Sequence, residues 1–124
     1  MNLLIEKVSD LNDMIMQGES KKAFELFYDD NVVIQHNDEP AVIGKEANKR
    51  LLEKDLNKIV EFKCAKPLKV TIGEQSTMVE WELNDVHVEH GERKYTQVAV
   101  QDWNAGLVIK EKLYCGNKLK QKKQ

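Results

Sequence analysis

The sequence predicts an α+β fold, with three N-terminal helices packed on one face of a mostly antiparallel sheet. The first observation behind this prediction is a change of hydrophobic period. Apolar residues recur every three or four positions up to about Ile59, as in helices, and alternate with polar residues from Val60 onward, as in strands. The second is that short turn-forming segments divide the later part of the chain at hairpin spacing. The clearest of them, Asn104-Ala105-Gly106, joins two β-branched and aromatic arms, residues 95–103 and 107–114.

Two helices are expected before residue 29. The first is about sixteen residues long and ends at Gly18, and its apolar stripe consists of Leu4, Ile5, Val8, Leu11 and Ile15. Ser20 is a suitable cap for the second helix, whose buried side consists of Ala23, Phe24, Phe27 and Tyr28. The run Asp29-Asp30-Asn31 then breaks the helical periodicity.

A short strand over residues 32–36 follows and ends at the turn-forming run Asn37-Asp38-Glu39-Pro40. A third helix is predicted after Gly44, from Lys45 to about Ile59, and its packing side consists of Ala47, Leu51, Leu52, Asp55, Leu56 and Ile59. Four strands complete the chain, at about 60–73, 76–90, 93–103 and 107–115. They are expected to form an antiparallel meander that carries the helices on one face.

Composition and charge are those of an ordinary globular domain. The 124 residues are 41% hydrophobic and 32% charged, which is enough for one core without disulfides. A net charge of −2 creates no field that gathers phosphates, so nucleic acid is not an expected partner, and the basic run at 118–124 is expected to be a solvated tail. Cys64 and Cys115 lack any metal-ligand or CxxC spacing, and no cofactor motif is present, so no cofactor is expected. The sequence shows neither a signal-peptide pattern nor an apolar run long enough to span a membrane, and we therefore expect a cytoplasmic protein without membrane association.

Three segments resemble the SnoaL-like branch of the nuclear transport factor 2-like superfamily. They are Phe27-Tyr28-Asp29-Asp30-Asn31-Val32-Val33-Ile34, Gly44-Lys45-Glu46-Ala47, and Asp102-Trp103-Asn104-Ala105-Gly106-Leu107-Val108-Ile109 with Glu111 and Tyr114 after it. The resemblance implies a cystatin-like cone, in which three N-terminal helices pack on a strongly curved, mostly antiparallel sheet and leave a pocket between them. It implies a single SnoaL-like domain over residues 1–117 and a homodimer formed through the outer sheet face. It says little about function, because the same cone hosts isomerases, cyclases, dehydratases, hydrolases and ligand-free adaptors.

Similarity to the superfamily's ketosteroid isomerases suggests where pocket residues lie. His36 stands where those enzymes have their general-base carboxylate, and Gln97 falls near the position of their protonated oxyanion-hole acid. Leu11 takes the place of their oxyanion tyrosine. Because all three positions depart from the isomerase pattern, that mechanism is disfavoured. Imidazole is nevertheless a competent base near neutral pH.

Strand alternation adds further candidates. Glu111 shares a face with Ile109 and Leu113 and is expected to point inward, where it would hold His36 in one tautomer and raise its basicity. The candidate catalytic residues are therefore His36 and Glu111. The candidate ligand-binding residues are Tyr28, Trp81, Gln97 and Trp103. The expected ligand is an apolar or polycyclic carbonyl compound, and an enzyme of the isomerase, cyclase or dehydratase type would use His36 as its base.

Other interpretations remain open. A strand-end histidine such as His36 is often solvent-facing or a cap, Glu111 can pair with a basic residue, and both tryptophans can belong to the core. Gln97 and Gln101 can face water in a dimer seam. The protein would then be a non-catalytic binding protein or a ligand-free dimeric module. No metal site is expected, because the spacing of His87 and His90 on a strand directs their rings to opposite faces.

The homodimer is also expected on physical grounds. Apolar residues are predicted on the sheet face away from the helices, where a second copy of the chain would cover them. They are Val70, Val86, Val88, Val98, Val100 and Val108.

Overall fold

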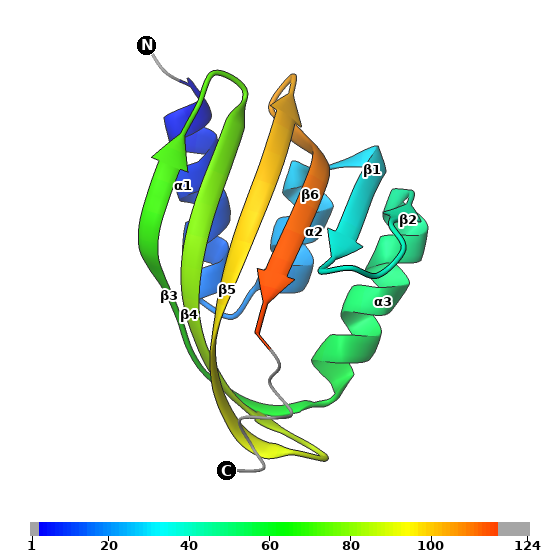
Figure 1. Ribbon diagram of the computed structural model, residues 1–124, viewed down its shortest axis with the longest axis vertical. Helices are drawn as coiled ribbons and strands as arrows, with labels where there is room; N and C mark the ends of the chain where they lie inside the picture. Colours follow the sequence, from blue (N-terminus) through cyan, green and yellow to red (C-terminus); the bar gives the residue numbers. More distant parts are fainter. Residues whose placement is uncertain (1–2, 117–124) are drawn as a thin grey trace.

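A curved six-stranded sheet with three helices packed on it makes up the computed structural model, which describes residues 3–116 (Figure 1). The helices are α1 (Leu3–Met16), α2 (Ser20–Phe27) and α3 (Lys45–Asn57). The strands are β1 (Tyr28–His36), β2 (Val42–Ile43), β3 (Ile59–Ile72), β4 (Ser76–His87), β5 (Gly91–Asn104) and β6 (Leu107–Cys115). The predicted α+β cone is thereby confirmed, while the predicted basic tail at 118–124 lies outside the described residues. None of the described helices has the length and apolar character needed to cross a membrane.

The strand order in the sheet is β2-β1-β6-β5-β4-β3. β1 runs parallel to β6, whereas all other neighbouring strands are antiparallel. The β4–β5 hairpin is long and curved and extends beyond the end of β6 (Figure 1). At its tip the backbone N–H of Val88 donates to the carbonyl of Lys58, which ties the hairpin to the segment after α3. The curvature turns the inner faces of these strands toward the helices.

Local sequence explains how α1 leads into α2. Val8 and Leu11 are buried in the core and Ile15 packs against it, as the apolar stripe predicts. Gly18 then adopts φ +80°, and the ring of Phe62 lies 3.1 Å from the point where a Cβ would stand. A larger residue would be both strained and crowded there, so glycine is needed at this turn.

Some boundaries differ from the sequence prediction. Ser20 is the first residue of α2 rather than its cap, because Glu19 occupies the N-cap position and makes no side-chain cap hydrogen bond. β1 begins at Tyr28 rather than at Val32, since the acidic run continues in extended form and the N–H of Asn31 donates to the Asp29 carboxylate. β2 was not expected, because a two-residue strand carries no detectable period.

A register shift in the β5–β6 pairing moves two residues to unexpected sides of the sheet. Asp102 pairs with Lys110, but Trp103 pairs with Val108, so one residue of β6 is skipped. Val108 is therefore buried in the core, and Ile109 is 37% exposed. Strict alternation predicts the reverse, so the predictions that Val108 faces outward and Ile109 inward are wrong.

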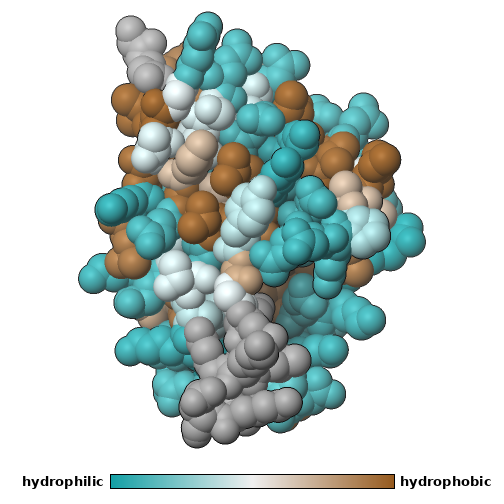
Figure 2. All heavy atoms as spheres, in the orientation of Figure 1, coloured by the Kyte–Doolittle hydropathy of each residue, from teal (hydrophilic) through white to brown (hydrophobic). Residues whose placement is uncertain are grey.

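The outer face of the sheet carries apolar side chains among hydrophilic ones (Figure 2). Met78 and Tyr114 are 48% and 45% exposed, and Val98 and Val100 are half-buried. These residues are neighbours, because Val98 pairs with Tyr114 and Val100 with Met78. Val70 does not join them as predicted, since it pairs with a core residue of β4 and lies on the inner side of the edge strand β3.

Candidate functional site

Strand register gathers polar residues in one row on the inner face of the sheet. Thr77 of β4 pairs with Gln101 of β5, which pairs with Glu111 of β6, which in turn pairs with Ile34 of β1. Directly paired residues point to the same side of a sheet. The next row is less polar and consists of Val79, Ala99, Leu113 and His36.

The carboxyl group of Glu111 is the centre of a buried hydrogen-bond network. The hydroxyl of Tyr28 donates to Glu111 Oε2 at 2.6 Å, and Gln101 Nε2 donates to the same oxygen at 2.8 Å. Glu111 is only 5% exposed, and both of its partners are buried as well. Tyr28 is held at the start of β1 by its ring contact with Phe24, at 4.8 Å between centroids. The network therefore fastens β1 to β5 and β6.

The network continues through β4 to Trp103. Thr77 Oγ1 donates to Gln101 Oε1 at 2.7 Å, and Trp103 Nε1 donates to Thr77 Oγ1 at 2.9 Å. Three hydrogen bonds lead in series from Trp103 through Thr77 and Gln101 to Glu111, and a fourth leads from Tyr28 to Glu111. The carboxyl oxygen Oε2 of Glu111 is thus the acceptor at which both series of hydrogen bonds end.

Burial alters the acid–base character of this centre. It raises the pKa of Glu111 above its ordinary value, while the hydrogen bonds from Tyr28 and Gln101 oppose the rise. Burial, reinforced by the nearby charge of Glu111, also raises the pKa of Tyr28 well above its ordinary value. Tyr28 consequently stays a donor, and Glu111 holds a proton more readily than a carboxyl group in water does. Buried carboxyl groups of this kind occur often in functional sites.

Trp103 also lines an open cleft of about 390 Å³. The other walls come from the start of α1, from the β3–β4 turn and from the β5–β6 turn (Figure 1). Their residues are Leu3, Leu4, Lys7, Glu74, Gln75, Asn104, Ala105 and Gly106. The indole ring is thus both the end of the buried network and part of the wall of the cleft.

His36 lies apart from the network. It is half-buried at the end of β1, where it pairs with Leu113 on the inner face. Within residues 3–116 no hydrogen bond or ion pair joins its side chain to Glu111, whose Oε2 is bonded by Tyr28 and Gln101. The structure therefore brings Tyr28 and Glu111 together and leaves His36 separate.

Trp81 and Gln97 form the row of the inner face that follows His36 and Leu113. The two residues are directly paired, and Gln97 also pairs with Cys115 of β6. Trp81 is 3% exposed and belongs to the hydrophobic core, whereas Gln97 is half-buried. Both are on the predicted inner side of the sheet.

Thr77 and the role of Gln101 were missed by the sequence analysis. Gln101 is 2% exposed and hydrogen-bonded within the core, so its alternative placement in a water-facing dimer seam is wrong. A usable signal was present, because Gln101 alternates with Trp103 on the side assigned to the pocket. A glutamine and a glutamate on the inner sides of adjacent strands, such as Gln101 and Glu111, favour a buried hydrogen bond between the two side chains.

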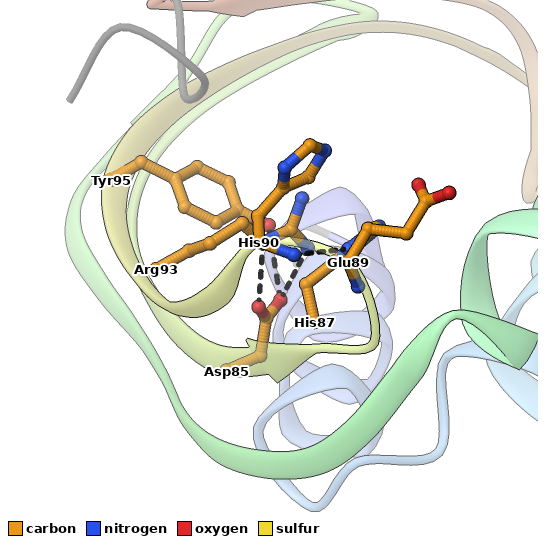
Figure 3. A network of polar contacts seen from close by, with 6 residues as sticks. All are labelled: Asp85, His87, Glu89, His90, Arg93 and Tyr95. Atoms are coloured by element: carbon orange, nitrogen blue, oxygen red, sulfur yellow. Dashed lines mark hydrogen bonds and ion pairs between the residues drawn. The ribbon is translucent and has the colours of Figure 1, made fainter. Parts of the chain in front are cut away.

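A second polar cluster lies at the tip of the β4–β5 hairpin (Figure 3). His87, Glu89 and His90 place potential metal ligands within 4.8 Å of one another. However, His87 Nδ1 accepts hydrogen bonds from the backbone N–H groups of Glu89 and His90, and the rings of His87 and His90 are stacked 4.6 Å apart rather than on opposite faces. Ring nitrogens bind metal in the ring plane, so nearly parallel stacked rings converge poorly on one ion. These hydrogen bonds and the ring stacking fit a role in stabilising the β4–β5 turn better than a role in binding a metal ion.

Comparison with known proteins yields structural relatives only. No family model and no curated protein matches the chain. An NTF2-like protein of unknown function from Burkholderia pseudomallei has a TM-score of 0.81 at 11% identity, covering 98% of this chain and 95% of that one. A candidate SnoaL-like polyketide cyclase from Mesorhizobium loti has a TM-score of 0.80 at 16% identity, covering 92% and 99%. An LEH-like epoxide hydrolase from M. tuberculosis has a TM-score of 0.75 at 13% identity, covering 95% and 86%. The chain therefore has the α+β cone fold of the SnoaL-like and NTF2-like proteins.

Proposed function

We propose that the protein binds an apolar or polycyclic carbonyl-type small molecule between α1 and the end of the curved sheet. The observation that carries the proposal is the cleft of about 390 Å³ beside Trp103, which falls within the usual size range of ligand sites. Leu3, Leu4 and the indole of Trp103 offer an apolar lining, and Gln75 and Asn104 offer polar groups at its edge. This is the composition expected for a site that takes an apolar body with a few polar substituents.

The buried network supports the same proposal. Trp103 is fixed by its hydrogen bond to Thr77, so its ring is a rigid platform that need not be ordered when a ligand binds. Burying a carboxyl group such as Glu111 lowers the stability of the fold, and apolar side chains of similar size would fill the core with a smaller loss. A role in ligand binding, through the rigid placement of Trp103, would explain why the network is present. Tyr28 anchors the network, and Trp81 and Gln97 extend the inner face beyond it.

Intrinsic fluorescence tests the proposal directly, because the chain contains two tryptophans and Trp81→Phe leaves Trp103 as a single reporter. We expect a saturable change of Trp103 emission on titration with a 3-ketosteroid or a hydroxyanthraquinone. Leu3→Asp should weaken binding by about tenfold or more, since it places a charge against the apolar ligand. Leu26→Asp is the matched control, because Leu26 is a similarly exposed helical leucine (57% against 60%) that does not line the cleft. Equal affinities for both variants, or no saturable signal, would argue against the site.

An enzymatic alternative uses His36 as general base. Its favourable observation is that His36 and Glu111 share the inner face two positions apart along the paired strands β1 and β6. In this alternative the ligand would have to extend from the cleft beside Trp103 along the inner face to His36, where an imidazole base and a carboxyl group of raised pKa lie on the same side of the sheet. The test is deuterium exchange next to the carbonyl of a bound ligand. His36→Gln should abolish the exchange and leave binding unchanged.

Dimerisation through the outer sheet face is proposed as a separate property. Met78, Val98, Val100 and Tyr114 form a continuous apolar group there, which a second copy would cover. Sedimentation equilibrium at micromolar concentration should give twice the chain mass of 14.3 kDa. Val100→Asp should give monomers, whereas Ile43→Asp, at a 73% exposed site outside this group, should not. A dimer without ligand binding would favour the ligand-free structural module.

A further inference from the structure

The β4–β5 hairpin carries a cluster of charged and polar side chains on its inner face that the proposed ligand cleft does not use. Asp85 pairs with Arg93 across the two strands, and Leu83 pairs with Tyr95 in the next position on this face. Figure 3 shows Asp85, Arg93 and Tyr95, together with His87 and His90, pointing into the curl of the hairpin. The cluster lies beyond the end of β6, at the opposite end of β5 from Trp103.

Asp85 holds the Arg93 guanidinium by one edge only. Arg93 Nε donates to Asp85 Oδ1 at 2.8 Å and Arg93 Nη2 donates to Oδ2 at 2.9 Å. The guanidinium centre also lies 5.3 Å from the centroid of the Tyr95 ring, which fixes its plane. A guanidinium has five N–H donors, so both Nη1 donors and one Nη2 donor remain. Within residues 3–116 these donors have no hydrogen-bond partner.

This free edge of Arg93 is not sealed inside the protein. Among the described residues, the buried side-chain polar atoms without a partner are the Oδ1 atoms of Asn12 and Asn84, and no atom of Arg93 is one of them. The Arg93 side chain is nevertheless only 10% exposed. A guanidinium whose Nη1 edge reaches solvent can bind a planar anion through its fork.

His87, two residues beyond Asp85 on β4, supplies a further donor in the same cluster (Figure 3). Because its Nδ1 accepts the N–H groups of Glu89 and His90, at 3.1 and 3.3 Å, the ring proton must reside on Nε2. Burial, and then the charge of Arg93, lowers the pKa of His87, so the ring stays neutral at pH 7 and keeps this tautomer. His87 is therefore a fixed Nε2–H donor next to a guanidinium.

We propose that the free Nη1/Nη2 edge of Arg93 and the Nε2–H of His87 bind a carboxylate. Asp85 and the Tyr95 ring are positioning residues, since they orient the guanidinium. A single carboxylate fits better than a phosphate dianion, because Asp85 already neutralises Arg93 and Glu89 adds a nearby negative charge. The ligand class is thus a monocarboxylic acid.

This site is independent of the proposed cleft. Arg93 and Trp103 are ten residues apart on the same strand, which corresponds to roughly 34 Å if the strand were straight. Even with curvature, a small molecule in the cleft does not reach Arg93. Failure of one proposal therefore leaves the other untouched.

NMR titration of the full chain with sodium benzoate at pH 7, with sodium chloride at equal ionic strength as reference, tests the proposal. The chain has two arginines, so the Nε–H signal of Arg50, which is exposed on α3, is an internal control for that of Arg93. We expect saturable shifts of Arg93 Nε–H and of the His87 ring with benzoate, and no such shifts with chloride. Linear shifts of equal size at both arginines would overturn the proposal.

A variant tests the role of the guanidinium fork. Arg93→Lys keeps the charge but loses the fork, and should weaken benzoate binding by about tenfold or more. If Arg93 and Asp85 formed only a structural ion pair, the wild type would not bind benzoate.

Discussion

Replacing Glu111 by glutamine should change how stability depends on pH, and the direction follows from the raised pKa of this buried carboxyl group. A carboxyl group whose pKa is higher in the folded chain than the ordinary 4.5 binds a proton more tightly when folded. Its favourable contribution is complete below pH 4.5 and is lost as the pH rises through the folded-state pKa. Across this window the wild type should lose up to about 1.4 kcal/mol per pH unit relative to Glu111→Gln.

The comparison of Glu111→Gln with the wild type follows from the same geometry. The glutamine oxygen can still accept from Tyr28 and Gln101, and its new NH₂ group takes the place of Glu111 Oε1, which is not among the fully buried atoms without a partner in the described residues. The gap between the two proteins, which is the free energy of unfolding of the wild type minus that of the variant, should fall as the pH rises. Tyr28→Phe should shift the window to higher pH, because it removes a hydrogen bond that opposes the pKa rise.

Urea denaturation followed by tryptophan fluorescence and far-ultraviolet circular dichroism, at several pH values from about 4.5 to 8, measures these gaps. Glu39→Gln is the matched control, because Glu39 is exposed and outside the network, and its gap to the wild type should stay constant. A Glu111→Gln gap that is constant or that rises with pH would refute the reasoning, because the carboxyl group would then be no harder to ionise when folded than when unfolded.

Three further predictions concern single side chains. His87 should lose stabilising power as the pH falls below its ordinary pKa of 6.5, because burial favours its neutral form, and His87→Asn should flatten the acid side of the stability–pH profile in urea titrations. Thr77→Val should lower the free energy of unfolding by about 2–4 kcal/mol, since it leaves the Trp103 N–H and the Gln101 oxygen without partners, whereas Thr71→Val, at an exposed site, should change it little. Asn12→Leu should raise the melting temperature, because it removes a buried oxygen that has no hydrogen-bond partner; a lower melting temperature would mean that an internal water satisfies this oxygen.

The sequence predicted the fold better than the chemistry of its interior, for physical reasons. Hydrophobic period and turn residues act locally, so the helix and strand order and the inward direction of Trp81, Gln97 and Glu111 could be predicted. Val108 was misplaced because a single skipped residue in the β5–β6 pairing reverses alternation without any signal of its own in the sequence.

Hydrogen-bond partners were harder to predict than faces. Tyr28 and Glu111 are 83 positions apart, and their contact depends on the parallel pairing of β1 with β6, which hydrophobic period does not reveal. The sequence therefore offered His36 as the partner of Glu111, by resemblance, whereas Tyr28 and Gln101 bind it in the structure. Long-range pairing is decided by the whole sheet and not by the residues at either end.

The parallel pairing of β1 with β6 has a consequence for the newly made chain. Tyr28 leaves the ribosome 83 residues before Glu111, which is a delay of about 4–17 s at ordinary rates of synthesis. Throughout this interval Val32 and Ile34 of β1, which are buried in the finished fold, lack β6 beside them. Nascent chains that stop before residue 107 should therefore be bound by chaperones or degraded, and the domain should become protease-resistant in a single late step when β6 is complete.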